Sequence, residues 1–195
     1  MKSLAQLIQQ KKQLRVVGFD DAPFQKEQDS QVSLSGIVCA NTRFEGMLWG
    51  EVTRDGTDAT DTLVNMLLPS KFFAQTHLVI TDGLAFGGFN LLDLPQLSER
   101  LSRPVIAVMR RRPDLEAIDR ALNLFSDAAT RKALVAEAGE IHEMEGFTFQ
   151  VAGCDAEEAG LALKQLTDTG KVPEALRLAH LIGSAVKTGQ SSNRA

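Results

Sequence analysis

The feature that most constrains the fold is a change of hydrophobic period early in the chain. Before the change, three apolar runs rich in β-forming residues occupy 15–20, 31–40 and 43–53. Only Asn41 and Thr42 separate the second run from the third. This spacing predicts a tight hairpin, although Asn-Thr is a weaker turn signal than Asn-Gly. The three runs therefore predict an antiparallel meander.

After the meander, helical and strand patterns alternate. A helical segment ends at Pro69, and short apolar runs at 77–83 and 105–109 are typical of buried strands. Each is followed by a helical segment, and a last strand is expected at 147–153. Strands joined through helices run parallel, with helices on both faces of the sheet. We therefore expect an α/β fold with a mixed sheet, in the element order of the ribonuclease H-like fold.

The length and composition favour a single domain over residues 1–195, with an N-terminal extension at 1–14 and a flexible tail at 188–195. No apolar run approaches the roughly 20 residues that cross a bilayer, and the N-terminus lacks the apolar core of a secretory signal. Cys39 and Cys154 lie far apart, so neither a disulfide framework nor a zinc site is expected. We expect a cytoplasmic protein that does not associate with membranes.

Two aspartates stand at the ends of strands that this fold would place side by side. Asp20 ends the first strand, in "RVVGFDD", and Asp82 ends the strand beside it. Neighbouring parallel strands bring their carboxyl ends to one edge, where open α/β sheets bind ligands. The segment "RDGTDATD" can supply a third acid, with Asp58 the first candidate and Asp55 and Asp61 the others. Hard divalent cations prefer such oxygen ligands, so a site for Mg²⁺ or Mn²⁺ is expected, held by Asp20, Asp58 and Asp82.

Each of these acids also has an ordinary structural interpretation. Asp21 begins a turn, and strand alternation points it away from Asp20. Asp58 and Asp61 resemble a helix cap, and Asp82 followed by glycine is a common strand exit. The sequence leaves both interpretations open.

Candidate substrate-binding residues lie near the same sheet edge. Arg110, Arg111 and Arg112 follow a strand end and could hold a phosphate, although charged strand ends are common on surfaces. The loop "AFGGFN" carries Phe86 and Phe89, which could stack on a base or pack as a lid on their own domain. The formal net charge of −4 counts mildly against a nucleic-acid partner but does not exclude one.

The last helix, expected at 173–187, presents two further candidates on its polar face. His180 is a candidate acid–base group or a partner of a metal ligand, and a solvated helix histidine is the alternative. Arg177 could reach a substrate phosphate or an acidic neighbour. The opposite face, which includes Ala179 and Val186, is expected to be buried.

Five motifs in order give the chain a resemblance to a known family. They are "VVGFDDAPF", "RDGTDATD", "TDGLAFGGFNLLDL", "PVIAVMRRRPD" and "VPEALRLAHLIGSAVKTGQS". Together they look like the prokaryotic family called domain of unknown function ninety-nine, a relative of endonuclease V, over about Arg15 to Ser191. The resemblance implies the ribonuclease H-like fold and cleavage of DNA or RNA near deaminated purines, with magnesium held by acidic residues.

The resemblance implies roles for individual residues and also has gaps. Asp20 and Asp82 match two acids of endonuclease V, and Asp58 or Asp55 stands where that relative has a glutamate. However, the chain has no tyrosine and so no Pro-Tyr-Ile-Pro wedge, and "LAFGGFN" replaces a His-Pro-Arg segment. "GCD" stands where the relative has "GHR". A phosphodiester substrate is implied more strongly than recognition of a deaminated base.

Two hypotheses follow. The first is a divalent-metal-dependent nuclease or related phosphodiesterase that acts on DNA or RNA. The alternative is a non-catalytic module that keeps the fold and binds a nucleic acid or a protein.

Overall fold

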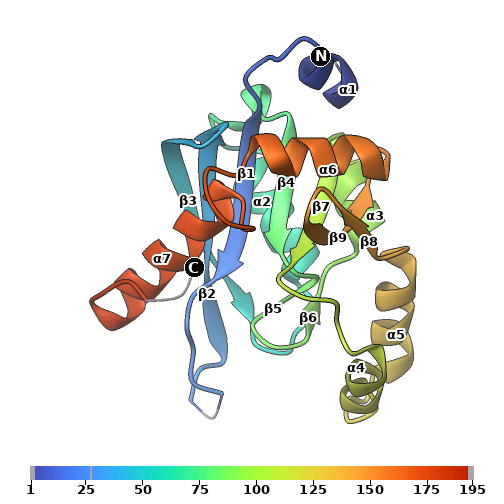
Figure 1. Ribbon diagram of the computed structural model, residues 1–195. Coiled ribbons are helices and arrows are strands. Elements are labelled where there is room, and N and C mark those ends of the chain that lie inside the picture. Colours follow the sequence, from blue (N-terminus) through green and yellow to red (C-terminus); the bar gives the residue numbers. More distant parts are fainter. Residues whose placement is uncertain (1–2, 27, 193–195) are drawn as a thin grey trace.

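The computed structural model describes residues 3–26 and 28–192. Its centre is a seven-stranded sheet with the order β3-β2-β1-β4-β7-β9-β8 (Figure 1). β1 pairs in parallel with β4, and β4 in parallel with β7, whereas the other pairs are antiparallel. The predicted mixed sheet with its meander is confirmed. The strands are β1 Arg15–Asp21, β2 Gln31–Ala40, β3 Arg43–Thr53, β4 Leu78–Asp82, β7 Val105–Met109, β8 His142–Met144 and β9 Phe147–Ala152, with β5 Ala85–Phe86 and β6 Asn90–Leu91 in a separate hairpin.

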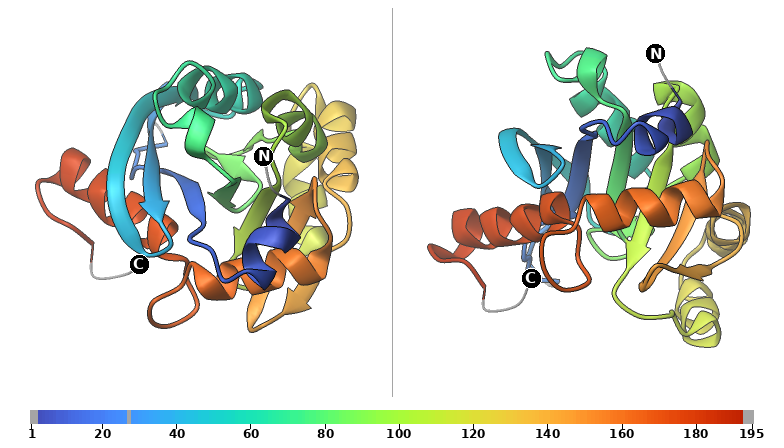
Figure 2. Two further views of the ribbon diagram at one scale, coloured as in Figure 1. Left: turned by 90° about the horizontal axis from the view of Figure 1, so that it is seen from above. Right: turned by 45° about the horizontal axis from the view of Figure 1, so that its top comes forward.

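Helices cover both faces of the sheet, as predicted. One buried cluster joins α1, α6 and α7 to one face, and a second joins α2 and α3 to the other. Strand alternation explains the division, because the neighbours Val16 and Val17 point into opposite clusters. Figure 2 shows α6 and α7 nearly end to end along one face. The helices are α1 Leu4–Gln9, α2 Ala59–Leu67, α3 Leu94–Leu101, α4 Leu115–Leu122, α5 Ala128–Glu137, α6 Ala156–Gln165 and α7 Glu174–Thr188, with a short 3₁₀ turn at Phe73–Gln75.

Two small β pairings were not part of the sequence prediction. β8 extends the sheet beyond β9, and β5 pairs with β6 across Gly87 and Gly88. These strands have two or three residues each, which is too few for an alternating pattern to be visible in the sequence.

Helix α7 lies directly on the backbone of β1. A Cβ atom on Gly18 would be 2.8 Å from the Cβ of Ala175, so only glycine permits this close approach. The hydroxyl of Ser35 in β2 donates to the carbonyl of Ala179 at 3.0 Å and to that of Asp20 at 3.2 Å. These contacts fix the position of α7 above the carboxyl end of β1.

The buried stripe of α7 differs from the predicted one. It continues through Gly183 and Ser184, whereas Val186 is 59% exposed. The prediction for Val186 was wrong because close approach to the sheet selects small side chains along the helix rather than the largest apolar ones. Gly183 packs against Ala22 just beyond the end of β1, where a Cβ atom would meet its main chain at 3.3 Å.

The two ends of the chain are described in part. The predicted N-terminal extension contains α1. This helix begins with a capping box between Ser3 and Gln6, and its buried residues Leu4 and Leu7 hold it against the domain. Of the predicted tail, residues 193–195 lie outside the described residues. In the part of the chain that the structure covers, no helix combines the length and the apolarity needed to cross a bilayer.

Candidate active site

The structure brings Asp20 and Asp82 together at one edge of the sheet. β1 and β4 run in parallel with Phe19 opposite Thr81, so the next residue of each strand is an aspartate. Both strands point toward the same edge in Figure 1. Asp20 is 4% exposed, and the charge of Asp82 acts on it directly. Two acids that are 62 positions apart in the sequence, by their numbers, therefore form one electrostatic unit.

Asp20 is the most perturbed acid at this edge. Burial is the largest cause and, with the charges of Asp82 and Asp21, it raises the pKa of Asp20 to about 8, against a smaller lowering effect of Arg110. His180 Nδ1 of α7 lies 3.1 Å from Asp20 Oδ2. A proton between these two atoms can be held by either group. The environment of Asp20 therefore favours its protonated form over its charged form.

Arg110 occupies the position of a counter-ion rather than that of a free phosphate ligand. Its Nη2 lies 3.3 Å from Asp82 Oδ2, and its side chain is 44% exposed. Arg111 is exposed at the surface next to it. Arg177, the other predicted phosphate ligand, forms two hydrogen bonds with Glu174, at 2.6 and 2.8 Å. The acidic neighbour expected as one alternative for Arg177 is therefore Glu174, one turn away on the same helix, and the phosphate-ligand alternative does not fit this geometry.

Asp58, the expected third metal ligand, faces protein donors instead. Its carboxylate accepts hydrogen bonds from the Thr53 main chain and hydroxyl and from the Asn90 amide. Burial alone would raise the pKa of Asp58, but these hydrogen bonds outweigh it and hold the pKa below its usual range. Over residues 3–26 and 28–192, no group of three or more His, Cys, Asp or Glu side chains is arranged to hold a metal ion. The predicted three-acid cluster is therefore corrected to a pair.

The alternatives to Asp58 are engaged as well. Asp55 Oδ1 accepts from the Phe89 N–H at 2.9 Å, and Asp61 Oδ1 pairs with Arg100 Nη1 at 2.5 Å. The acids of "RDGTDATD" thus fasten the start of α2 to the β5–β6 hairpin and to α3. The first-turn position that predicted a third ligand is used for structure.

Asp21 has a role that the sequence did not reveal. Its Oδ2 accepts a hydrogen bond from the Gly87 N–H at 2.6 Å, which ties the end of β1 to the tip of the β5–β6 hairpin. Burial is the main cause that raises the pKa of Asp21, with a further contribution from Asp82. Asp20 faces α7 whereas Asp21 faces the hairpin, as strand alternation predicts.

The two phenylalanines of the hairpin have different environments. Phe86 is 1% exposed and belongs to the core cluster under α2 and α3, so it packs on its own domain, as one of the two alternatives predicted, and stacking on a base is wrong for it. Burying a whole aromatic ring stabilises the fold, and exposing the ring to solvent would lose that stabilisation. Phe89 packs edge-on against Phe125, with 5.7 Å between ring centroids, and lines a cavity.

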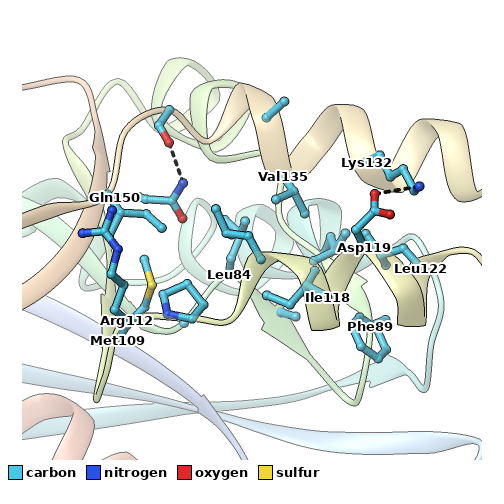
Figure 3. A pocket seen from close by; sticks show the side chains of 18 of the residues that line it. Leu84, Phe89, Met109, Arg112, Ile118, Asp119, Leu122, Lys132, Val135 and Gln150 are labelled. Carbon is cyan, nitrogen blue, oxygen red and sulfur yellow. Dashed lines mark hydrogen bonds and ion pairs between the residues drawn. The ribbon is translucent and has the colours of Figure 1, made fainter.

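This cavity, which Figure 3 shows from close by, has a volume of about 560 Å³. Gly83 and Met109 line it, and they are the chain neighbours of Asp82 and Arg110. Its walls come from α4, α5 and the β4–β5 connection, and they are mainly apolar. Side chains that form them include Leu84, Phe89, Ile118, Leu122 and Val135. No pattern in the sequence indicates the cavity, since it forms between helices whose placement the hydrophobic periodicity does not specify.

The residues at the edge fit a hard divalent cation. Asp20 and Asp82 offer carboxylate oxygens, and magnesium is commonly held by one or two carboxylates together with waters and substrate phosphates. Burial is the largest cause that raises the pKa of Asp20, and the like charges of Asp82 and Asp21, which add to it, are ones that a cation would offset. Arg110 now supplies part of that charge and is exposed enough to move aside.

Comparison with known proteins shows the family to which the chain belongs. The family model described as endonuclease dU matches residues 12–187. A "UPF0215 protein" of Deinococcus radiodurans is 40% identical over 179 residues, 91% of this chain and 91% of the relative. Another, of Methanothermobacter thermautotrophicus, is 39% identical over 190 residues, 95% of this chain and 93% of the relative.

Solved structures support the fold. The crystal structure of a protein of unknown function from Archaeoglobus fulgidus has 36% identity and a TM-score of 0.84, over 89% of this chain and 98% of that chain. The catalytic domain of human endonuclease V has 13% identity and a TM-score of 0.58, over 94% and 86%. Endonuclease V of Ciona intestinalis, in complex with inosine-containing DNA, has 16% identity and a TM-score of 0.52, over 87% and 84%.

The last two likenesses concern the fold alone, and they confirm the predicted ribonuclease H-like architecture. Since the family model covers most of the sequence and relatives share more than a third of it, the chain belongs to the endonuclease dU family.

Proposed function

We propose that this protein is a nuclease that hydrolyses a phosphodiester bond of DNA with the help of Mg²⁺ or Mn²⁺. The observation that carries the proposal is the pair of buried Asp20 and partly exposed Asp82 at the carboxyl edge of two parallel strands. Asp20 and Asp82 would hold the ion. When bound, such an ion lowers the pKa of a water and polarises the phosphate.

The chain's own residues supply the remaining parts. His180 faces Asp20 at 3.1 Å and holds or transfers a proton at its Nδ1. Arg111 is exposed next to Arg110 and binds a backbone phosphate of the DNA strand, whereas Arg112 pairs with Glu143 at 3.2 Å. Asp21 holds the hairpin tip in place through the Gly87 N–H and takes no part in the chemistry.

The comparisons direct the choice of substrate. The family description, endonuclease dU, and the inosine-containing DNA bound by the endonuclease V of Ciona intestinalis point to DNA that carries a deaminated base. Two free cysteines, one of them buried, are consistent with a reducing compartment such as the cytoplasm.

The test is cleavage of labelled oligonucleotides that contain deoxyuridine or inosine, in Mg²⁺, Mn²⁺ or EDTA. We expect metal-dependent cleavage by the wild type, which Asp20→Asn and Asp82→Asn each abolish. Asp61→Asn is the matched control, because Asp61 is an exposed acid that pairs with Arg100 away from the edge. Cleavage that persists in both edge variants contradicts the proposal.

A second candidate function is a non-catalytic module that binds nucleic acid or protein. The observation that favours it is the ion pair of Arg110 with Asp82, which partly neutralises the edge without any metal. This candidate predicts that oligonucleotide binding is equally tight in EDTA and that no substrate in the panel is cut. Cleavage that depends on Asp82 excludes it.

A further inference from the structure

The cavity beside Asp82 contains one polar group whose orientation is fixed. Gln150 of β9 is 5% exposed and lines the cavity. Its Nε2 donates to the carbonyl of Gly139 at 2.8 Å, as the dashed line at Gln150 in Figure 3 marks. Because the amide nitrogen is held there, the Oε1 atom is presented as an acceptor.

This acceptor is available to a ligand. Within residues 3–26 and 28–192, no group donates a hydrogen bond to Gln150 Oε1, and no buried side-chain oxygen lacks a partner. The two facts are compatible only if Oε1 is accessible from the cavity. A carbonyl oxygen in apolar surroundings favours a donor opposite it and disfavours another lone pair.

The rest of the cavity suits a flat ring. Its volume of about 560 Å³ lies within the range usual for small-molecule sites. Leu84, Ile118 and Val135 offer apolar surface, and Phe89 adds an aromatic face (Figure 3). The Lys132–Asp119 ion pair, at 2.7 Å, closes the wall between α4 and α5.

The position of the cavity would bring it close to the DNA strand that is cut. Gly83 lines it and directly follows Asp82, so a base inside it belongs to a nucleotide next to the aspartate pair. Enzymes that act on particular bases take them out of the stack into such a pocket.

We propose that Gln150 is a specificity-determining residue, whose Oε1 accepts a hydrogen bond from the ring N–H of a base held in this cavity. The inference rests on the proposed function. Uracil and hypoxanthine carry a ring N–H next to a carbonyl, whereas cytosine and adenine carry a bare ring nitrogen at the same place. A fixed acceptor therefore favours the first pair and opposes the second, without any change in shape.

The experiment measures binding of single-stranded oligonucleotides by fluorescence anisotropy in EDTA, so that neither metal nor cleavage is needed. The probes differ at one nucleotide: deoxyuridine, deoxycytidine, or deoxyuridine methylated at N3, the ring nitrogen that otherwise carries the hydrogen. We expect the wild type to bind the deoxyuridine probe about tenfold more tightly than the other two, as one buried hydrogen bond provides.

Gln150→Leu is expected to bring the three affinities together. The matched control is Gln165→Leu, which removes another glutamine that donates to a main-chain carbonyl, that of Lys12 at 2.8 Å, far from the cavity. A purely structural role for Gln150 would lower all affinities alike and leave the tenfold ratio unchanged. If Gln150→Leu does not fold, Val135→Phe replaces it, because the larger ring fills the cavity and should also remove the ratio.

The outcomes separate this inference from the proposed function. A wild type that cuts DNA but binds the three probes equally overturns the role of Gln150 and leaves the nuclease intact. A ratio that survives in folded Gln150→Leu, or in Val135→Phe, overturns it too. A wild type that binds no probe and cuts none overturns both.

Discussion

Two groups of aspartates in this protein show how the same side chain serves opposite purposes. Asp55 and Asp58, in the connection from β3 to α2, accept hydrogen bonds from main-chain and amide donors, and the pKa of Asp58 is lowered. Asp20 and Asp82 lie at the carboxyl edge of β1 and β4 instead, where burial and the charge of Asp82 raise the pKa of Asp20. The first group accepts several hydrogen bonds from the protein, whereas in the second, among the side chains of the described residues, only His180 pairs with Asp20 and only Arg110 with Asp82.

The difference separates structural from functional acids better than their positions in the sequence do. Asp58 precedes a helix near the sheet, as a ligand would, yet its lone pairs are used by Thr53 and Asn90. Perturbed acids cluster at functional sites because the fold holds them where folding alone would not favour them. A test of this difference therefore makes the same substitution in one aspartate of each group and compares the results.

The largest expected effect is on activity. Asp20→Asn should reduce metal-dependent cleavage by about 1,000-fold or more, on the scale of about 4 kcal/mol in the barrier. Asp58→Asn should keep most of the rate, because Asp58 does not reach the pair. Initial rates in Mn²⁺ measure both, with folding checked by circular dichroism. Equal losses in the two variants would remove the distinction between the groups.

The next effect is on the pH dependence of stability. The folded-state pKa of Asp20, about 8, is above its unfolded value. The contribution of Asp20 to folding stability is therefore full below about pH 4 and is lost as pH rises through about 8. Within this window the free energy of unfolding of the wild type should fall by up to about 1.4 kcal/mol per pH unit. The free energy of unfolding of Asp20→Asn should not show this fall. Urea unfolding in EDTA between about pH 5 and pH 8 measures it. Parallel profiles would contradict the raised pKa.

A smaller effect is expected on stability when a satisfied acid is removed. Asp58→Ala leaves the Thr53 and Asn90 donors without their acceptor and should cost about 2 kcal/mol. Thermal unfolding should show a decrease in midpoint of about 4–8 °C. Affinity for Mn²⁺, measured by calorimetry, should stay within about twofold of the wild type. A weakened metal site with unchanged stability would make Asp58 a ligand after all.

The smallest effect concerns the cation already present. Arg110→Gln removes the guanidinium from Asp82 and should raise the affinity for Mn²⁺ about tenfold, since the ion then displaces no partner. Arg111→Gln is the control, because Arg111 is exposed beside it. Calorimetric titration measures both. Weaker binding in Arg110→Gln would mean that Arg110 supports the metal site rather than competing for it.

The sequence was sufficient for the elements that depend on long, regular patterns. The meander, the parallel strands and the meeting of Asp20 with Asp82 follow from strand order and from the rule that parallel strands share an edge. No distant contact had to be known to infer them.

Other features depend on contacts that a local pattern does not contain. His180 had the pattern of a solvated helix residue, and only the fit of Ala175 onto Gly18 brings it to Asp20. Asp58 could not be assigned to Asn90, because their 32-residue separation includes a hairpin that was not predicted. The cavity likewise depends on how α4 and α5 pack.

The close fit of α7 on β1 has a consequence for biosynthesis. Asp20 is made early, but the helix that carries its partner His180 follows 160 residues later. A growing chain on the ribosome therefore has no finished edge until the segment through His180 has emerged. If the protein cuts nucleic acid, that delay means that unfinished or truncated copies carry the acids without the histidine, which limits stray cleavage by immature molecules.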